Sequence, residues 1–100
     1  MMSNQVTSVT YTLDRPRNFI FDLNAMVELE GVYGSYQEAL DVLKGGKIKD
    51  VITWLWAGFV HEEQTLTIQE MGRILSATDP DIVAKLGDEL LNVASRGRLL

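Results

Sequence analysis

The chain has 100 residues, 46% hydrophobic and 23% charged, a composition typical of one globular domain and not of a disordered segment. Its net charge is −5 and its basic residues are scattered, so we expect no binding to DNA or RNA. It contains no cysteine and no apolar run of membrane-spanning length, which excludes disulfides, thiolate chemistry and a membrane span.

The first predicted elements are two short strands. Residues 6–12 are rich in β-branched side chains, and residues 19–21 form a second short apolar run. Between them, residues 14–17 contain an aspartate and a proline, which are both typical turn residues. We therefore predict a β-hairpin over residues 5–21. Residues 1–5 lack the basic and apolar regions of a signal peptide, so we expect the protein to stay in the compartment where it is made.

Five helices are predicted after the hairpin, because start signals recur at regular intervals. Asp22 or Asn24 can cap the first helix. Ser35 and Thr67 are each followed three residues later by a glutamate, which is the pattern of a capping box. Pro80 suits the first position of the last helix, where its missing N–H is not needed. The predicted helices cover residues 23–33, 35–44, 47–61, 67–78 and 80–96.

The third predicted helix, residues 47–61, is the most apolar. Apolar side chains cover more than half of its circumference: Ile48, Val51, Ile52, Trp54, Leu55, Trp56, Phe59 and Val60. A helix of this kind lies at the centre of a core or is partly uncovered for a partner. We predict a mainly α fold in a single domain, residues 1–100. About five short helices in residues 22–96 would surround this central helix, with the N-terminal β-hairpin before them.

No motif indicates catalysis. The single histidine, His61, has Thr65 at the position where a zinc-binding helix needs a second histidine. The glycines match neither the dinucleotide-binding nor the phosphate-binding pattern. We therefore expect a protein that binds other proteins and is not an enzyme, with no cofactor and no metal.

Glu30 is the one charged residue within an apolar stripe of its predicted helix. The stripe consists of Leu23, Met26, Val27 and Tyr33. Glu30 is either a general acid with a raised pKa or a structural carboxylate, and no second catalytic group supports the first interpretation. Because an unpaired buried charge is too costly, we predict that Glu30 is at least half buried and paired inside the chain, with Arg73 as its partner.

Trp54 and Trp56 lie about 200° apart on a helix, so one core contact cannot hold both. Either both belong to the core, against different neighbours, or one of them, Trp54 by preference, anchors a partner protein. The apolar residues Leu99 and Leu100 would extend such a surface. The candidate partner-binding residues are Trp54, Gly58, Leu99 and Leu100.

Three stretches of the sequence, taken in order, are similar to a known family. Residues 17–30 read RNFIFDLNAMVELE, and residues 52–59 read ITWLWAGF, before the acidic pair Glu62 and Glu63. Residues 66–70 then read LTIQE. The order and spacing of these stretches over residues 17–76 resemble the tail assembly chaperones of long-tailed bacteriophages.

The resemblance implies a protein that binds the tape measure protein and helps to recruit tail tube subunits. It would act in the host cytoplasm and be absent from the mature virion. We expect the chain to self-associate, as a homo-oligomer, or to bind a helical segment of the tape measure protein. A virion component, such as a head–tail connector or a tail completion protein, fits the composition equally well. A DNA-binding regulator would need a basic recognition helix, and residues 47–61 are too apolar for that role.

Overall fold

The computed structural model describes residues 8–97, and the side chains of residues 8–95. Two strands come first, β1 (Ser8–Thr12) and β2 (Pro16–Ile20). The helices that follow within residues 8–97 are α1 (Leu23–Tyr33), α2 (Tyr36–Lys44), α3 (Ile48–Phe59), α4 (Ile68–Ser76) and α5 (Pro80–Gly97), with a 3-10 turn η1 (Val60–Glu62) after α3. The predicted fold class, five helices after a β-hairpin, is confirmed.

The hairpin turns earlier than its sequence suggests. β1 and β2 are antiparallel, with Ser8 opposite Ile20 and Thr12 opposite Pro16. The turn therefore comprises residues 13–15, and β2 begins at Pro16 and not at residue 19. A proline is tolerated at the first position of a strand, so it does not have to belong to the turn. Residues 5–7 of the predicted hairpin lie outside the described residues.

Side-chain caps start three of the helices, but of the two predicted capping boxes only the one at Thr67 is complete, because at Ser35 only the serine half is formed. Asp22 and Ser35 each accept a hydrogen bond from the backbone N–H three residues further on, at the starts of α1 and α2. Thr67 and Glu70 form a complete capping box at the start of α4. The helix α3 begins after Lys47 without a side-chain cap. None of the helices within residues 8–97 has the length and hydropathy needed to cross a bilayer.

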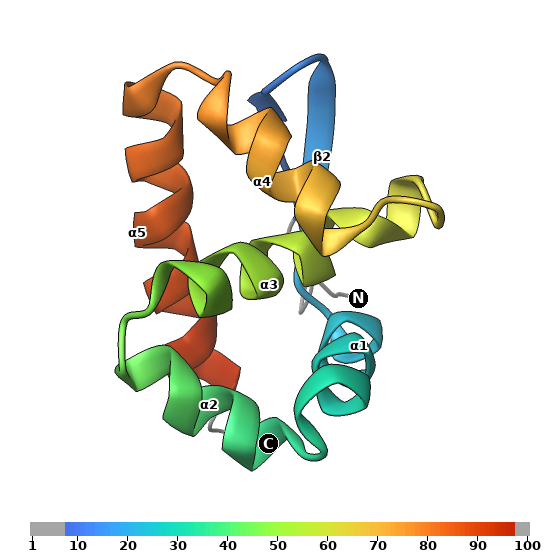
Figure 1. Ribbon diagram of the computed structural model, residues 1–100, viewed down its shortest axis with the longest axis vertical. Coiled ribbons are helices and arrows are strands. Elements are labelled where there is room, and N and C mark those ends of the chain that lie inside the picture. The colour runs from blue at the N-terminus through green and yellow to red at the C-terminus, as the bar shows by residue number, and fades with distance from the viewer. Residues whose placement is uncertain (1–7, 98–100) are drawn as a thin grey trace, which may run out of the picture.

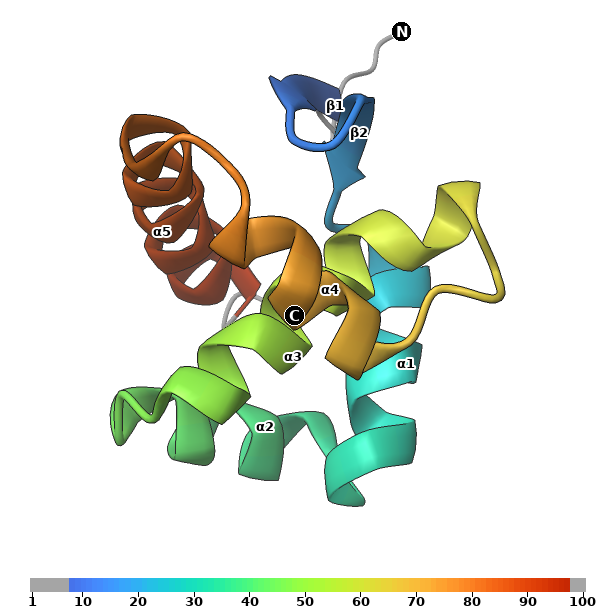
Figure 2. The ribbon, with the colours of Figure 1, turned by 45° about the horizontal axis from the view of Figure 1, so that its top comes forward.

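The helix α3 is the centre of the molecule, as predicted. It crosses the middle of the structure, with α4 on one side and α2 on the other, α5 at one end and α1 towards the other (Figure 1). Its residues Trp54, Leu55 and Phe59 are at most 2% exposed. The hairpin stands at the edge of this helical layer, where β2 contacts α3 (Figure 2). The core is therefore built around one helix.

A glycine allows the hairpin to dock on α3. The ring of Phe19, on β2, lies directly on Gly58, where a Cβ atom would be only 2.1 Å from Cε1 of the ring. The same ring meets Phe59 edge to face, with the ring centroids 5.2 Å apart. A side chain at position 58 would therefore push the hairpin away from the core.

Candidate partner-binding site

Trp54, the predicted partner anchor, is a core residue. Its side chain is fully buried, and its indole Nε1–H donates a hydrogen bond of 3.1 Å to the backbone carbonyl of Ala39. The ring of Phe21 stacks on it at a centroid distance of 5.3 Å, and the ring of Tyr36 lies 5.7 Å away. Because the indole is fully buried, Trp54 belongs to the core, which was one of the two alternatives, and the prediction that it anchors a partner is wrong.

The other three candidate partner-binding residues do not form an exposed surface among the described residues. Gly58 is buried beneath the ring of Phe19, so its role is to let two elements approach each other. Leu99 and Leu100 lie outside the described residues, so their predicted contribution stays a prediction.

The prediction for Glu30 is wrong, because α1 is rotated relative to the predicted orientation. The helix buries Ala25 and Leu29, while Leu23 and Val27 of the predicted stripe are 65% and 61% exposed. Glu30 and Arg73 are both exposed, and no ion pair joins them within residues 8–95. Apolar residues occur on both sides of α1. Of the predicted stripe, Leu23 and Val27 face outward, while Tyr33 packs against the core and donates a hydrogen bond of 2.7 Å to Asp50 on α3.

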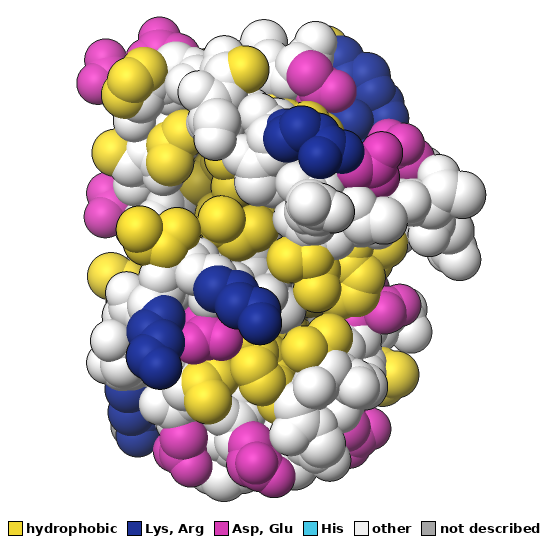
Figure 3. Space-filling view, in the orientation of Figure 1, with side chains coloured by type: hydrophobic (Ala, Val, Ile, Leu, Met, Phe, Trp, Pro, Cys, Tyr) yellow, Lys and Arg dark blue, Asp and Glu magenta, His cyan; other side chains and the backbone are white. Residues whose placement is uncertain are grey.

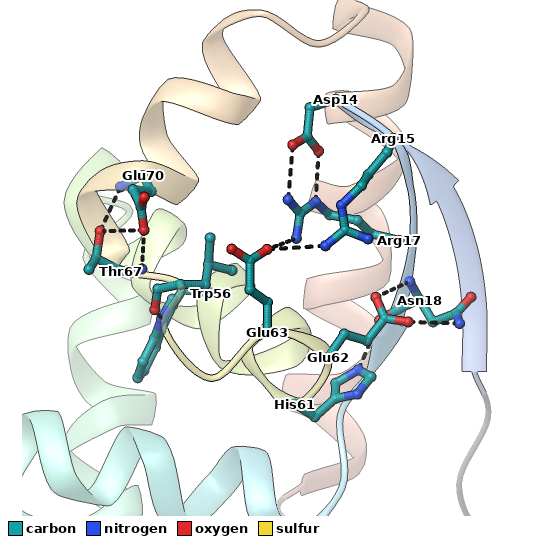
Figure 4. Close-up of polar contacts among 11 residues, drawn as sticks. Asp14, Arg15, Arg17, Asn18, Trp56, His61, Glu62, Glu63, Thr67 and Glu70 are labelled. Atoms are coloured by element: carbon teal, nitrogen blue, oxygen red, sulfur yellow. Dashed lines mark hydrogen bonds and ion pairs between the residues drawn. The ribbon is translucent and has the colours of Figure 1, made fainter.

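An accessible apolar row runs along α3. Ile48 is 77% exposed, and Ile52 and Trp56 follow at intervals of one helical turn and are only partly buried. The Nε1–H of Trp56 donates a hydrogen bond of 2.7 Å to the carbonyl of Leu66, which holds the indole beside the loop that leads to α4 (Figure 4). We call Ile48, Ile52 and Trp56 the α3 row. Trp56, and not Trp54, is therefore the tryptophan that reaches the surface.

Lysines flank the exposed end of this row. Lys44, Lys47 and Lys49 are all exposed and surround Ile48 in the sequence. Within residues 8–95 none of the three takes part in an ion pair. Figure 3 shows basic side chains beside the hydrophobic ones that gather over α3, between α4 and α2. The surface around the start of α3 is therefore apolar and locally basic on a chain whose net charge is −5.

The outer face of α1 is apolar and acidic. It consists of Leu23 and Val27, one turn apart, with the exposed carboxylates Glu28 and Glu30 on either side. Gly31 continues the row, and the space where its Cβ atom would stand is open. The helix contains no lysine or arginine. The apolar residues on both sides of this helix were the signal in the sequence that one side would stay uncovered.

A cluster of charged side chains joins the hairpin to the residue that follows η1. Arg17 is 3% exposed, and its Nε and Nη2 atoms donate hydrogen bonds of 2.7 and 2.9 Å to the carboxylate of Asp14 (Figure 4). Its Nη1 donates one of 3.1 Å to Glu63, which also accepts one of 3.1 Å from Arg15. A buried charge needs ion pairs and hydrogen bonds to offset its loss of hydration, and the two carboxylates supply both to the guanidinium of Arg17.

These contacts shift the pKa values of the charged groups in the cluster. The hydrogen bond from Arg17 holds the pKa of Asp14 below its usual value. The hydrogen bonds from Arg17 and then Arg15 do the same for the pKa of Glu63. Hydrogen bonding to Asp14 in turn raises the pKa of Arg17. All three groups are thus held in their charged forms.

The acidic pair after α3 completes the attachment of the hairpin. Glu62 accepts hydrogen bonds of 3.1 and 2.9 Å from the backbone N–H and the side-chain amide of Asn18, on β2. His61 lies with its Nε2 2.9 Å from the carbonyl oxygen of the same asparagine. The structure gives the segment a function in fixing β2 to η1.

Among the described residues, no group of three or more histidine, aspartate and glutamate side chains is placed to hold a metal ion. Comparisons with models of protein families, with curated proteins and with solved structures found no match. The two exposed apolar surfaces, on α3 and α1, are therefore the main candidates for a functional site in this part of the chain.

Proposed function

We propose that this chain is a non-enzymatic tail assembly chaperone of a long-tailed bacteriophage. It binds the tape measure protein and helps to recruit tail tube subunits while the tail is built in the host cytoplasm, and it is absent from the finished particle. The observation that carries the proposal is the α3 row, three apolar side chains left accessible along the central helix of the fold. The resemblance over residues 17–76 supplies the identity of the partner.

The geometry of the α3 row suits a helical client. Ile48, Ile52 and Trp56 follow one another at intervals of four residues, a rise of about 6 Å along the axis, which matches the apolar stripe of an amphipathic helix laid beside them. Tryptophan is enriched among binding hot spots. The hydrogen bond from Nε1–H of Trp56 to the carbonyl of Leu66 fixes the orientation of its indole before a partner binds. The nearby lysines favour a client helix with acidic residues along its apolar stripe.

The residues that carry the resemblance have defined places in this fold, which supports the proposal. Phe19 and Gly58 form the contact between β2 and α3. Asp22 caps α1, and Thr67 with Glu70 caps α4. A chain that shared these stretches would be able to build the same central helix with the same accessible row.

Co-expression with the tape measure protein of the same genome tests the proposal. We expect the tape measure protein to be soluble and to co-purify with the wild-type chain. Ile48→Asp, which places a charge in the row, and Trp56→Ala should each weaken the binding about tenfold or more. Leu91→Asp is the matched control, because Leu91 is 64% exposed on α5, outside the row.

The opposite result leads to the alternative function. If the tape measure protein is equally soluble without this chain and the two never co-purify, the chaperone function is wrong. Mass spectrometry of purified particles then becomes the relevant measurement. Finding the chain in particles would identify a virion component, such as a head–tail connector or a tail completion protein.

A further inference from the structure

We propose that the outer edge of β1 binds an extended, basic segment of another protein, which pairs antiparallel with β1 as a third strand of the sheet. The inference goes beyond the chaperone function, because it concerns a different surface and does not involve the α3 row. It rests on a difference between the two edges of the hairpin. Within residues 8–97, the edge of β2 is occupied by side chains and the edge of β1 is open.

The outer edge of β2 is occupied by side chains of η1. The backbone N–H of Asn18 donates a hydrogen bond of 3.1 Å to Glu62, and its carbonyl oxygen lies 2.9 Å from Nε2 of His61 (Figure 4). The strand also begins with Pro16, which has no N–H to offer to a further strand. Contacts and prolines of this kind prevent a sheet edge from pairing with another chain.

The alternation of hydrogen bonds shows which backbone groups of β1 point outward. Thr10 lies opposite the asparagine whose backbone groups are used on the outer side of β2, so Thr10 directs its own N–H and carbonyl away from β2. The hydrogen bond of 3.0 Å from the N–H of Leu13 to the carbonyl of Arg15 continues the inner series into the turn. Because the alternation has a period of two, Ser8 and Thr12 also direct their backbone groups outward.

The outer edge of β1 lacks the protection that the edge of β2 has. Ser8, Thr10 and Thr12 are exposed, and their outward backbone groups form no hydrogen bond with another element of the described chain. The strand contains no charged residue, no proline and no bulge. A row of unpaired N–H and C=O groups on such a strand is a template for a further strand, which would gain main-chain hydrogen bonds.

The surroundings of this edge favour a basic segment. The strand β1 is the one that lies nearer α5 (Figures 1 and 2). Burial raises the pKa of Tyr11, and the negative charge of Glu89 on α5 raises it further, so a carboxylate acts on the inner face of the edge. A third strand would place every second side chain on that face, beside Val9 and Tyr11. Lysine or arginine at these positions would complement Glu89 and the net charge of −5.

A second copy of this chain is a poor occupant of the edge. In a sheet formed by β1 of two copies, the inner faces of both hairpins would lie on the same side, and so would both copies of α5. This arrangement would bring together two helices that each contain Asp81, Asp88 and Glu89, on chains of net charge −5. The third strand therefore comes from a different protein, one with basic residues.

Synthetic peptides test the pairing with the wild-type chain. The probe is a peptide of about nine residues in which valine and lysine alternate. With its lysines on the inner face, an antiparallel third strand directs the valine N–H groups towards β1 and the lysine N–H groups away from it. Methylation of the valine nitrogens should therefore abolish the binding measured by calorimetry, and methylation of the lysine nitrogens should preserve it. The two methylated peptides have the same charge, so each is the matched control for the other.

A substitution in β1 tests the same edge from the other side. Thr10→Pro removes an outward N–H and keeps the hydrogen bonds to β2, since proline is tolerated on an edge strand. We expect a circular dichroism spectrum like that of the wild type and a dissociation constant for the probe raised about tenfold or more. Thr10→Val keeps the N–H and loses only the side-chain hydrogen bond to Asn18, so it should bind like the wild type.

The opposite results are equally clear. No binding of the probe, binding that Thr10→Pro leaves unchanged, or any other response to the two methylations would overturn the proposal. If Thr10→Pro does not fold, the methylated peptides decide, because they need only the wild-type chain. A species of two chains in sedimentation equilibrium that Thr10→Pro abolishes would assign the edge to a second copy instead. None of these measurements involves the tape measure protein, so the result is independent of the proposed chaperone function.

Discussion

At the scale of single residues, Trp54 and Trp56 differ in burial although they are two positions apart on the same helix. Trp54 is enclosed between Phe21 and Tyr36, and Trp56 lies at the edge of the accessible row. Their spacing in the sequence predicts that they face different sides of α3. It does not predict which side is covered, because that depends on where the hairpin and α2 pack.

Replacing Trp54 should damage folding and not binding. Trp54→Ala removes a fully buried ring, and we expect the free energy of unfolding to fall by about 3–5 kcal/mol. Trp54→Phe keeps most of the ring but leaves the carbonyl of Ala39 without its donor, at a cost of about 1–3 kcal/mol. Urea denaturation followed by circular dichroism measures both. Wild-type stability in Trp54→Ala would contradict the buried position.

Two glycines should respond in opposite ways to the same substitution. Gly58→Ala forces a Cβ atom against the ring of Phe19, and we expect a loss of about 1–3 kcal/mol in unfolding free energy. Gly31→Ala meets open space in the last turn of α1 and should add up to about 1 kcal/mol through helix propensity. Thermal and urea unfolding of both variants would compare them. Equal effects would mean that Phe19 does not rest on Gly58.

At the scale of elements, the sequence predicted where the helices begin but not how they are rotated. Asp22, Ser35 and Thr67 start helices through hydrogen bonds to residues three positions away, so the signal is local. The rotation of α1 depends on its contact with α3, which the pattern of α1 alone does not contain. The same limit applies to Arg17, whose partner Glu63 is 46 positions away in the sequence.

The attachment of the hairpin to η1 should depend on pH. The pKa values of Asp14 and Glu63 are lowered in the folded state, so their contribution to stability is complete above the unfolded-state values of about 4. It is lost as the pH falls through the folded-state values. Arg17→Met should therefore lower the free energy of unfolding more at about pH 7 than at about pH 3.

The control for this prediction is a charge outside the cluster. Lys85→Met removes an exposed lysine of α5, and its effect on the unfolding free energy should be small at both pH values. Urea unfolding of the wild type and both variants across the pH range provides the comparison. A difference between Arg17→Met and the wild type that does not change with pH would show that Arg17 contributes only through packing.

At the scale of the whole molecule, stability depends on α3. It contacts α1, α2, α4, α5 and β2, so no other helix can lose its contacts without uncovering part of it. The long helix α5 has a different position, because its main contacts are with α3 alone. Its buried residues Leu86, Leu90 and Val93 attach it to one side of the core. We therefore expect α5 to open before the rest of the molecule unfolds.

Native-state hydrogen exchange should show this order. Amides of α3 should exchange only through global unfolding, and amides of α5 through a smaller opening at lower free energy. Two side-chain truncations distinguish the local opening of α5 from global unfolding. Leu90→Ala, on α5, should lower both free energies by the same amount, about 2–5 kcal/mol. Leu29→Ala, on α1, should lower the value for α3 and leave that for α5 unchanged, since α5 can detach while α1 stays packed. If Leu29→Ala lowers the free energy of exchange equally in α3 and α5, the two helices unfold together, and α5 is part of the same cooperative unit.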